Sequence, residues 1–212
     1  YIDALYKKDE DKIYVVERDP KKGRVFVEYD ARYVFYYPDA RGKHRSMAGE
    51  TLQKVQCRTS KEFIKEQRIR SNKTLHEQDI NPVFRCLEEN YLGKETPKLN
   101  VLFFDIEVDF MPEKGFAPVT DPFASITAIS VYLQWVDSLI TLALIPPTLN
   151  VAEATKLAEE FENTWLYESE DELLKTFLDL IDDVDVLSGW NSEGFDIPYI
   201  VNRVTLVLGK HY

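Results

Sequence analysis

The chain has 212 residues, of which 44% are hydrophobic and 13% aromatic, enough apolar material for a folded core. It has no apolar run of about 18 residues, so neither a membrane span nor a membrane partner is expected. Two cysteines and three histidines are scattered along it, namely Cys57, Cys86, His44, His76 and His211. This usage favours a reducing, cytoplasmic compartment and argues against a disulfide scaffold or a Cys/His zinc site.

Charge is divided unevenly along the chain, whose net charge is −11. Residues 1–100 carry 21 Lys/Arg and 17 Asp/Glu, a net charge of +4, whereas residues 101–212 carry 5 and 20, a net charge of −15. Residues 41–73 hold ten basic and three acidic side chains. That stretch is either a solvated surface of a helix and loops or a phosphate-contacting face.

The first hundred residues predict short strands followed by helices. Segments rich in Val, Tyr and Phe predict strands at 12–19, 24–30 and 32–39. Helices are expected over 59–71 and 79–93, and 94–100 ("KETPKLN") has the composition of a linker. We therefore expect a β-rich N-terminal domain over 1–98 and a second domain over 99–212.

The second domain opens with "LNVLFFDIEV" at 99–108, a continuous apolar run that predicts a strand buried on both faces. After a Pro/Gly-rich loop, 125–135 and 138–145 predict a β-hairpin. The later elements are a helix over 169–184 with a Ser169/Glu172 capping box, a strand at 185–190 and a helix over 195–209. This order indicates a layered α/β fold.

Two carboxylates mark the end of the first strand of this domain. Asp105 and Glu107 are two residues apart, so both side chains lie on one face of the strand. Like charges this close repel unless a cation lies between them, and paired hard oxygen donors suit Mg²⁺ or Mn²⁺. The alternative is a pair of solvated loop acids, which is how Asp109 is interpreted.

A second polar cluster follows the strand predicted at 185–190. Asn191, Phe195 and Asp196 have the spacing N-x-x-x-F-D, where the chain turns and a helix begins. An acid is favoured there by the helix dipole. Taken singly, the three could equally be a turn residue, a core residue and a helix cap.

Together, "FFDIEV" and "GWNSEGFDIPYIVNRV" resemble the Exo I and Exo II motifs of family B DNA polymerases, most closely the T-even phage type. "DINPVFRCLEENYL" resembles the segment by which such polymerases leave their N-terminal domain. The resemblance implies a ribonuclease H-like (DnaQ-like) sheet with flanking helices, preceded by a β-rich domain. It also implies a phage-encoded protein that acts in the host cytoplasm.

The resemblance further implies a proofreading 3′–5′ exonuclease that hydrolyses the primer's 3′-terminal phosphodiester with two metal ions, Mg²⁺ or Mn²⁺. Asp105 would bridge both metals, Glu107 would hold the first metal, and Asp196 would serve the second. Asn191 and Phe195 would contact the terminal nucleotides. The implied partners are a single-stranded DNA 3′ end, primer-template DNA, and the remaining polymerase domains in the same chain or in a split subunit.

One departure from the family pattern limits this expectation. The third motif of the family, Tyr-x-x-x-Asp on a later helix, does not follow Asp196. We therefore expect a piece of a longer polymerase, with an incomplete two-metal site and weak or no activity by itself. The apolar stripe Ile200, Val204 and Leu208 would then have little to pack against.

Two other functions stay open at this point. The basic stretch at 41–73 favours a non-catalytic module that binds DNA or a partner. A stand-alone ribonuclease H-like nuclease would need a third acidic motif, for which 169–183 is the one acid-rich candidate, and most of its acids face away from the apolar stripe.

Overall fold

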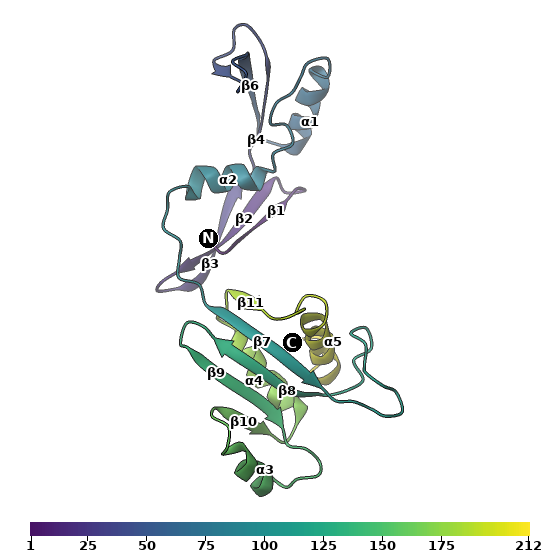
Figure 1. Cartoon of the computed structure of the whole chain (residues 1–212). Coiled ribbons are helices and arrows are strands. Elements are labelled where there is room, and N and C mark those ends of the chain that lie inside the picture. Colours follow the sequence, from purple (N-terminus) through teal and green to yellow (C-terminus); the bar gives the residue numbers. More distant parts are fainter. The chain divides into compact units, whose positions relative to one another are not determined.

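The computed structural model describes residues 1–212 (Figure 1). The chain divides into two compact units, Tyr1–Lys98 (unit 1) and Leu99–Tyr212 (unit 2). Each unit has its own hydrophobic core.

Unit 1 is made of two small antiparallel sheets and two helices. Its elements in chain order are β1 (Asp3–Lys7), β2 (Lys12–Asp19), β3 (Gly23–Asp30), β4 (Tyr33–Pro38), β5 (His44–Arg45), β6 (Thr51–Cys57), α1 (Ser60–Ile69) and α2 (Pro82–Tyr91). One sheet has the order β1-β2-β3 and the other β4-β6-β5. The predicted strands and helices of this unit are therefore present, but β1, β5 and β6 were not predicted.

The core of unit 1 is small and includes both cysteines. Ile13 and Val15 of β2 are fully buried, and α2, which packs against β1 and β2, contributes Cys86. Cys57, at the end of β6, is also buried and free. Burial raises the pKa of the Cys57 thiol to about 11, so this group is an inert core residue.

Residues 41–73 were interpreted as a surface helix and loops or as a phosphate-contacting face, but they also contain the strands β5 and β6. β6 pairs along its whole length with β4, from Tyr33↔Cys57 to Pro38↔Leu52. Leu52 and Cys57 are buried while Lys54 is exposed. The strand was missed because its pairing partner, which satisfies its backbone hydrogen bonds, lies far away in the sequence.

Unit 2 is a mixed α/β layer. Its elements are β7 (Val101–Val108), β8 (Ile126–Leu133), β9 (Ser138–Leu144), α3 (Val151–Ala158), β10 (Thr164–Tyr167), α4 (Glu170–Ile181), β11 (Val186–Ser188) and α5 (Asp196–Val207). The five-stranded sheet has the order β10-β9-β8-β7-β11. β8 pairs antiparallel with both β7 and β9, whereas β11 pairs in parallel with β7 and β10 pairs in parallel with β9. α3 and β10 were not predicted.

Only one face of this sheet is covered. Leu102, Phe104 and Ile106 of β7 are buried in a core shared with α4 and α5, and α4 lies against the strands (Figure 1). The residues between them, Asp105 among them, are exposed. The prediction that β7 is buried on both faces is therefore wrong. An apolar side chain on the open face, Phe103, made the run look continuous, and it is 44% exposed.

Two further details of the helices differ from the sequence-based expectation. Ser169 is the N-cap of α4, but its side chain makes no cap hydrogen bond, so the predicted capping box with Glu172 is wrong. The Ser169 hydroxyl instead bonds the carboxylate of Asp171, whose pKa is lowered as a result. The apolar stripe of α5 is also not left bare, because Ile200 and Val204 are each only 6% exposed in the core shared with α4.

A buried ion pair fixes α5 against the rest of unit 2. Arg203 is 8% exposed, and its Nε donates to Glu170 Oε1 at 2.7 Å. The same guanidinium donates to the Pro122 carbonyl at 2.8 Å, and Glu170 Oε1 accepts from the Ile126 amide at 2.8 Å. One network thus joins α4, α5, the start of β8 and the loop before it.

None of the helices in the structure has the length and apolar character needed to cross a lipid bilayer.

Candidate active site

The end of β7 carries the first carboxylates of the site. Asp105 and Glu107 are both exposed on the open face of the sheet, and Ile106 between them is buried. The pairing with β8 shifts between Glu107 and Val108, where a bulge ends the regular ladder. Asp109 follows as an exposed loop acid whose carboxylate accepts a hydrogen bond from the next amide, that of Phe110.

The turn that follows β11 brings a distant segment to the same place. A Cβ at Gly189 would lie 2.4 Å from the Phe104 carbonyl oxygen, so only glycine lets this chain come so close to β7. Asn191 has φ of 55°, a left-handed conformation that Asn tolerates better than most residues. Its carbonyl accepts hydrogen bonds from the Gly194 and Phe195 amides, each at 3.0 Å. The turn is therefore short, closed and fixed.

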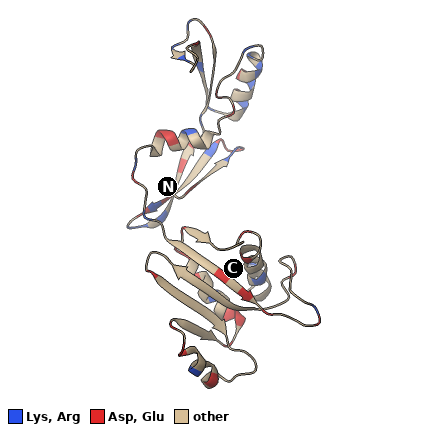
Figure 2. Ribbon diagram, in the orientation of Figure 1, with Lys and Arg blue, Asp and Glu red and all other residues tan.

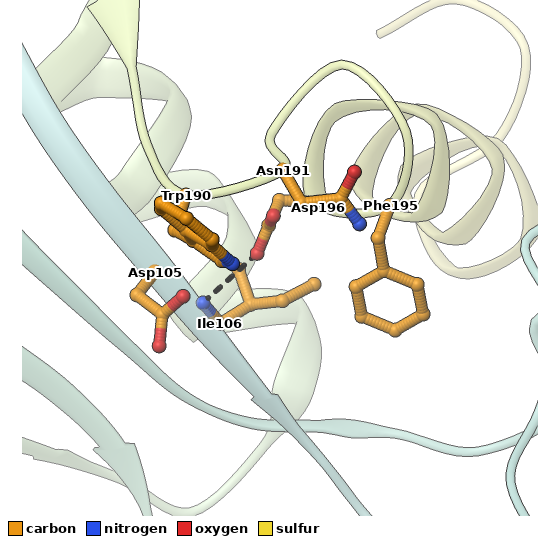
Figure 3. A pocket seen from close by; sticks show the side chains of 6 residues that line it. All are labelled: Asp105, Ile106, Trp190, Asn191, Phe195 and Asp196. Carbon is orange, nitrogen blue, oxygen red and sulfur yellow. Dashed lines mark hydrogen bonds between the residues drawn. The ribbon is translucent and has the colours of Figure 1, made fainter.

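β7 and this turn enclose one shallow pocket of about 550 Å³ (Figure 3). The side chains that line it are Asp105, Ile106, Trp190, Asn191, Phe195 and Asp196. No Lys, Arg or His is among them. The pocket therefore holds two carboxylates, an amide and two large aromatic rings, without a cationic side chain.

Asp196 is the buried member of the carboxylate pair. It is only 3% exposed, and its Oδ1 accepts a hydrogen bond from the Ile106 amide of β7 at 3.3 Å (Figure 3). Phe195 is the N-cap of α5, so Asp196 is the first helical residue and its carboxylate points across to the strand. Burial raises the pKa of Asp196, and the negative charge of Asp105 raises it further.

Four of the five residues singled out from the sequence meet in this pocket: Asp105, Asn191, Phe195 and Asp196. Glu107 does not line it, although it lies on the same face of β7 two residues further on. Nowhere in the structure do three or more His, Cys, Asp or Glu side chains lie close enough to hold a metal ion. The acids of the site therefore come together as a pair rather than as a triad.

Trp190 lines the pocket and was not predicted as a site residue. Its side chain is 90% exposed. The strand predicted at 185–190 included Trp190, which concealed its exposure, but β11 ends at Ser188 and leaves this large aromatic residue in the polar turn "GWNSEG".

The chemistry of this donor set suits a divalent cation. Two carboxylates without a cationic partner repel each other. Burial is the main cause of the raised pKa of Asp196, and the negative charge of Asp105 adds to it. Carboxylate oxygens are the ligands that Mg²⁺ and Mn²⁺ prefer. A cation between Asp105 and Asp196 would remove the repulsion, and Glu107 is the nearest further carboxylate along β7.

Comparison with known families gives the site its context. The exonuclease domain of DNA polymerase family B matches residues 51–210. The chain belongs to this family. The matched span covers nearly all of unit 2 and about the second half of unit 1, and it includes every residue that lines the pocket.

Relatives of this family B chain include viral and cellular polymerases. The chain is 33% identical over 117 residues to the DNA polymerase catalytic subunit of Saimiriine herpesvirus 2, covering 53% of this chain and 11% of that protein. The DNA polymerase delta catalytic subunit of Plasmodium falciparum is 29% identical over 168 residues, 71% of this chain and 14% of that protein. The DNA-directed DNA polymerase of Enterobacteria phage T4 is 60% identical over 25 residues, 12% and 3%. The chain thus spans a small part of the length of these relatives.

Proposed function

We propose that this chain is the N-terminal and 3′–5′ exonuclease region of a replicative family B DNA polymerase. Unit 1 would be the β-rich N-terminal domain and unit 2 a ribonuclease H-like proofreading domain. The observation that carries the proposal is the meeting of Asp105 and Asp196, 91 positions apart in the sequence, in one pocket without a cationic side chain.

In this proposal the carboxylates would hold Mg²⁺ or Mn²⁺. When bound, two such cations activate a water molecule and stabilise the charge that develops on the phosphate and on the leaving 3′-oxygen. Asp105, the exposed carboxylate of the pair, would contribute to both cations. Asp196 would serve one of them from its buried position, and Glu107 would complete the set from the next outward position of β7.

The remaining pocket residues would bind the DNA end. The Phe195 ring lies at the side of the pocket, where it can pack against a base or a sugar (Figure 3). The Asn191 amide can donate to a phosphate or base oxygen. Stacking tolerates any base, as removal of a mismatched 3′ nucleotide of any identity requires.

We further propose that the chain cleaves DNA slowly by itself. Its acids come together as a pair, and no group of three lies close enough to hold a metal ion. A cation held by two carboxylates keeps more of its water ligands and binds more weakly than one held by three or four.

The test is metal-dependent shortening of a 5′-labelled single-stranded oligonucleotide by the chain and by its Asp105→Ala, Glu107→Ala variant. Shortening with Mg²⁺ or Mn²⁺ that the double variant abolishes supports the proposal. Asp109→Ala is the matched control, because it removes an exposed acid only two residues further on. Equal cleavage by the chain and the double variant would show that the activity comes from elsewhere.

A second candidate is a DNA- or partner-binding role for unit 1, favoured by its exposed cations. Figure 2 shows Lys and Arg recurring along the ribbon of unit 1. Of these, Lys43, Arg45 and Lys54 lie on and next to the β5–β6 pair, all three are exposed, and none of them takes part in an ion pair with an acid. DNA binding that weakens steeply with salt and persists in the Asp105→Ala, Glu107→Ala variant would support this role. Loss of that binding in a Lys43→Ala, Lys54→Ala variant would place it on unit 1.

A further inference from the structure

Trp190 is the most conspicuous side chain whose role the acid chemistry leaves open. Its side chain is 90% exposed and makes no contact with another aromatic ring, whereas Phe195 in the same pocket packs against Tyr199 at 5.3 Å between ring centroids. A fully hydrated indole gives up most of the free energy that its burial would supply. Unlike the other exposed apolar side chains, this ring lines the pocket that holds Asp105 and Asp196, where it is available to a ligand.

The backbone of the turn that carries this exposed ring is closely constrained. Gly189 approaches the Phe104 carbonyl too closely for any side chain, and Asn191 on the other side is in the left-handed conformation. A Cβ at Gly194 would lie 2.4 Å from Asn191 Oδ1, so the turn is closely packed on itself. The backbone on both sides of Trp190 is therefore defined, so ligand binding needs to order the side-chain torsions of Trp190 but not the turn that carries it.

The position of the ring relative to the carboxylates suggests what it binds. In Figure 3 the Trp190 indole lies on the Asp105 side of the pocket and the Phe195 ring on the opposite side, with Asp196 and Ile106 between them. A strand whose phosphate is held at the carboxylates would bring its nearest base next to the exposed indole. Aromatic faces bind bases of any identity by stacking.

We infer that Trp190 is a positioning residue that stacks on a nucleobase at the 3′ end of single-stranded DNA. This inference rests on the proposed function, because it takes the strand to enter the pocket with a phosphate at Asp105 and Asp196. It adds a second aromatic contact, on the side opposite Phe195, so that the end of the strand is held between two rings.

The experiment uses the fluorescence of Trp190 itself. The chain has three tryptophans, so Trp135→Phe and Trp165→Phe leave Trp190 as the single indole. The measurements are made with Asp105 and Glu107 intact and with Ca²⁺ in place of Mg²⁺ or Mn²⁺, so that a cation can still hold the phosphate at the carboxylates. Recovery of full-length DNA after each titration confirms that nothing is cut. Ten-nucleotide oligo(dT) is titrated, intact or with an abasic residue at one of its last three positions.

We expect the intact oligonucleotide to quench Trp190 on binding, and Trp190→Leu to weaken binding, measured by anisotropy of a 5′ dye, by about tenfold. One of the abasic positions should weaken binding to the Trp190 chain by a similar factor and should cost nothing further in the Trp190→Leu chain. Trp190→Phe should retain part of the affinity. Trp165→Leu, made in the chain that keeps Trp135 and Trp190, is the matched control for the anisotropy measurement, because β10 lies at the opposite edge of the sheet from β11.

Absence of quenching, or equal affinity of the Trp190 and Trp190→Leu chains, would overturn the inference. So would abasic losses that are the same in both chains, because the base would then be held elsewhere. The proposed function is tested separately by metal-dependent cleavage. Cleavage without quenching would leave the exonuclease proposal standing and remove Trp190 from it.

Discussion

Unit 1 has a partly buried aspartate, Asp11, and unit 2 has a fully buried one, Asp196. Their pKa values are shifted in opposite directions. In unit 1, Asp11 Oδ1 accepts hydrogen bonds from the Tyr33 hydroxyl at 2.5 Å and from the Ser60 amide at 2.8 Å. Burial alone would raise the pKa of Asp11, but these donors lower it below its ordinary value. In unit 2, Asp196 accepts one long bond from the Ile106 amide, has Asp105 nearby, and its pKa is raised.

This difference separates a structural carboxylate from one that is available to a ligand. The charge of Asp11 is matched by donors from two elements, so it fastens the start of α1 to the β1–β2 turn. The charge of Asp196 has no comparable partner, so it costs stability until a cation or a proton supplies one. Glu170 shows that unit 2 can also satisfy an acid fully, because it is paired with Arg203.

The largest effect is expected from breaking that satisfied pair. Arg203→Met leaves Glu170 buried without its cation and should lower the free energy of unfolding by about 3–5 kcal/mol, measured by urea denaturation. Lys175→Met is the matched control. It breaks an exposed pair with Asp171 and should cost under about 0.5 kcal/mol. Similar losses in the two variants would mean that the buried network contributes no more than a surface pair.

A smaller loss is expected in unit 1 from Asp11→Ala. The Tyr33 hydroxyl and the Ser60 amide lose their acceptor, and alanine must adopt the left-handed backbone of Asp11, where φ is 50°. We expect a loss of about 2–3 kcal/mol in the free energy of unfolding. Asp11→Asn keeps the acceptor and tolerates this backbone, so it should lose about 1 kcal/mol. Equal losses of stability in Asp11→Ala and Asp11→Asn would mean that the charge of Asp11, rather than its hydrogen bonds, stabilises unit 1.

The smallest effect, and one of opposite sign, is expected from Asp196→Asn. Asparagine keeps an acceptor for the Ile106 amide without the charge, so at neutral pH in EDTA the variant should be as stable as the parent or up to about 1 kcal/mol more stable. Loss of more than about 1 kcal/mol would show that the ionised carboxylate is a structural group like Asp11.

The two aspartates should also respond to pH in opposite directions. Because the pKa of Asp196 is raised by folding, its protonation stabilises the native state as the pH falls through that value, fully below the ordinary value of 3.8. The contribution of Asp11, whose pKa is lowered, is present above 3.8 and is lost as the pH falls through the lowered value. Urea denaturation of each Asn variant against the parent from pH 7 to pH 3 measures both slopes.

Most of the regular elements, and the residue types of the site, could be predicted from local patterns in the sequence. Period-two alternation and turn residues predict β2, β3, β8 and β9, and the period of α4 and α5 is equally clear. Asp105, Asn191, Phe195 and Asp196 were found from their local contexts and from the resemblance to family B polymerases, to which the chain belongs. These signals are local, so no partner segment is needed to recognise them.

The surroundings of each of these residues, by contrast, depend on how distant segments pack and could not be predicted. The packing of α4 and α5 determines three features that the sequence did not predict. One face of β7 is covered, Glu107 does not line the pocket, and the apolar stripe of α5 is buried. The raised pKa of Asp196 and the exposed ring of Trp190 likewise arise from contacts, or their absence, between segments far apart in the sequence. Burial and electrostatic environment are sums over neighbours in space, and a local pattern of residues does not contain them.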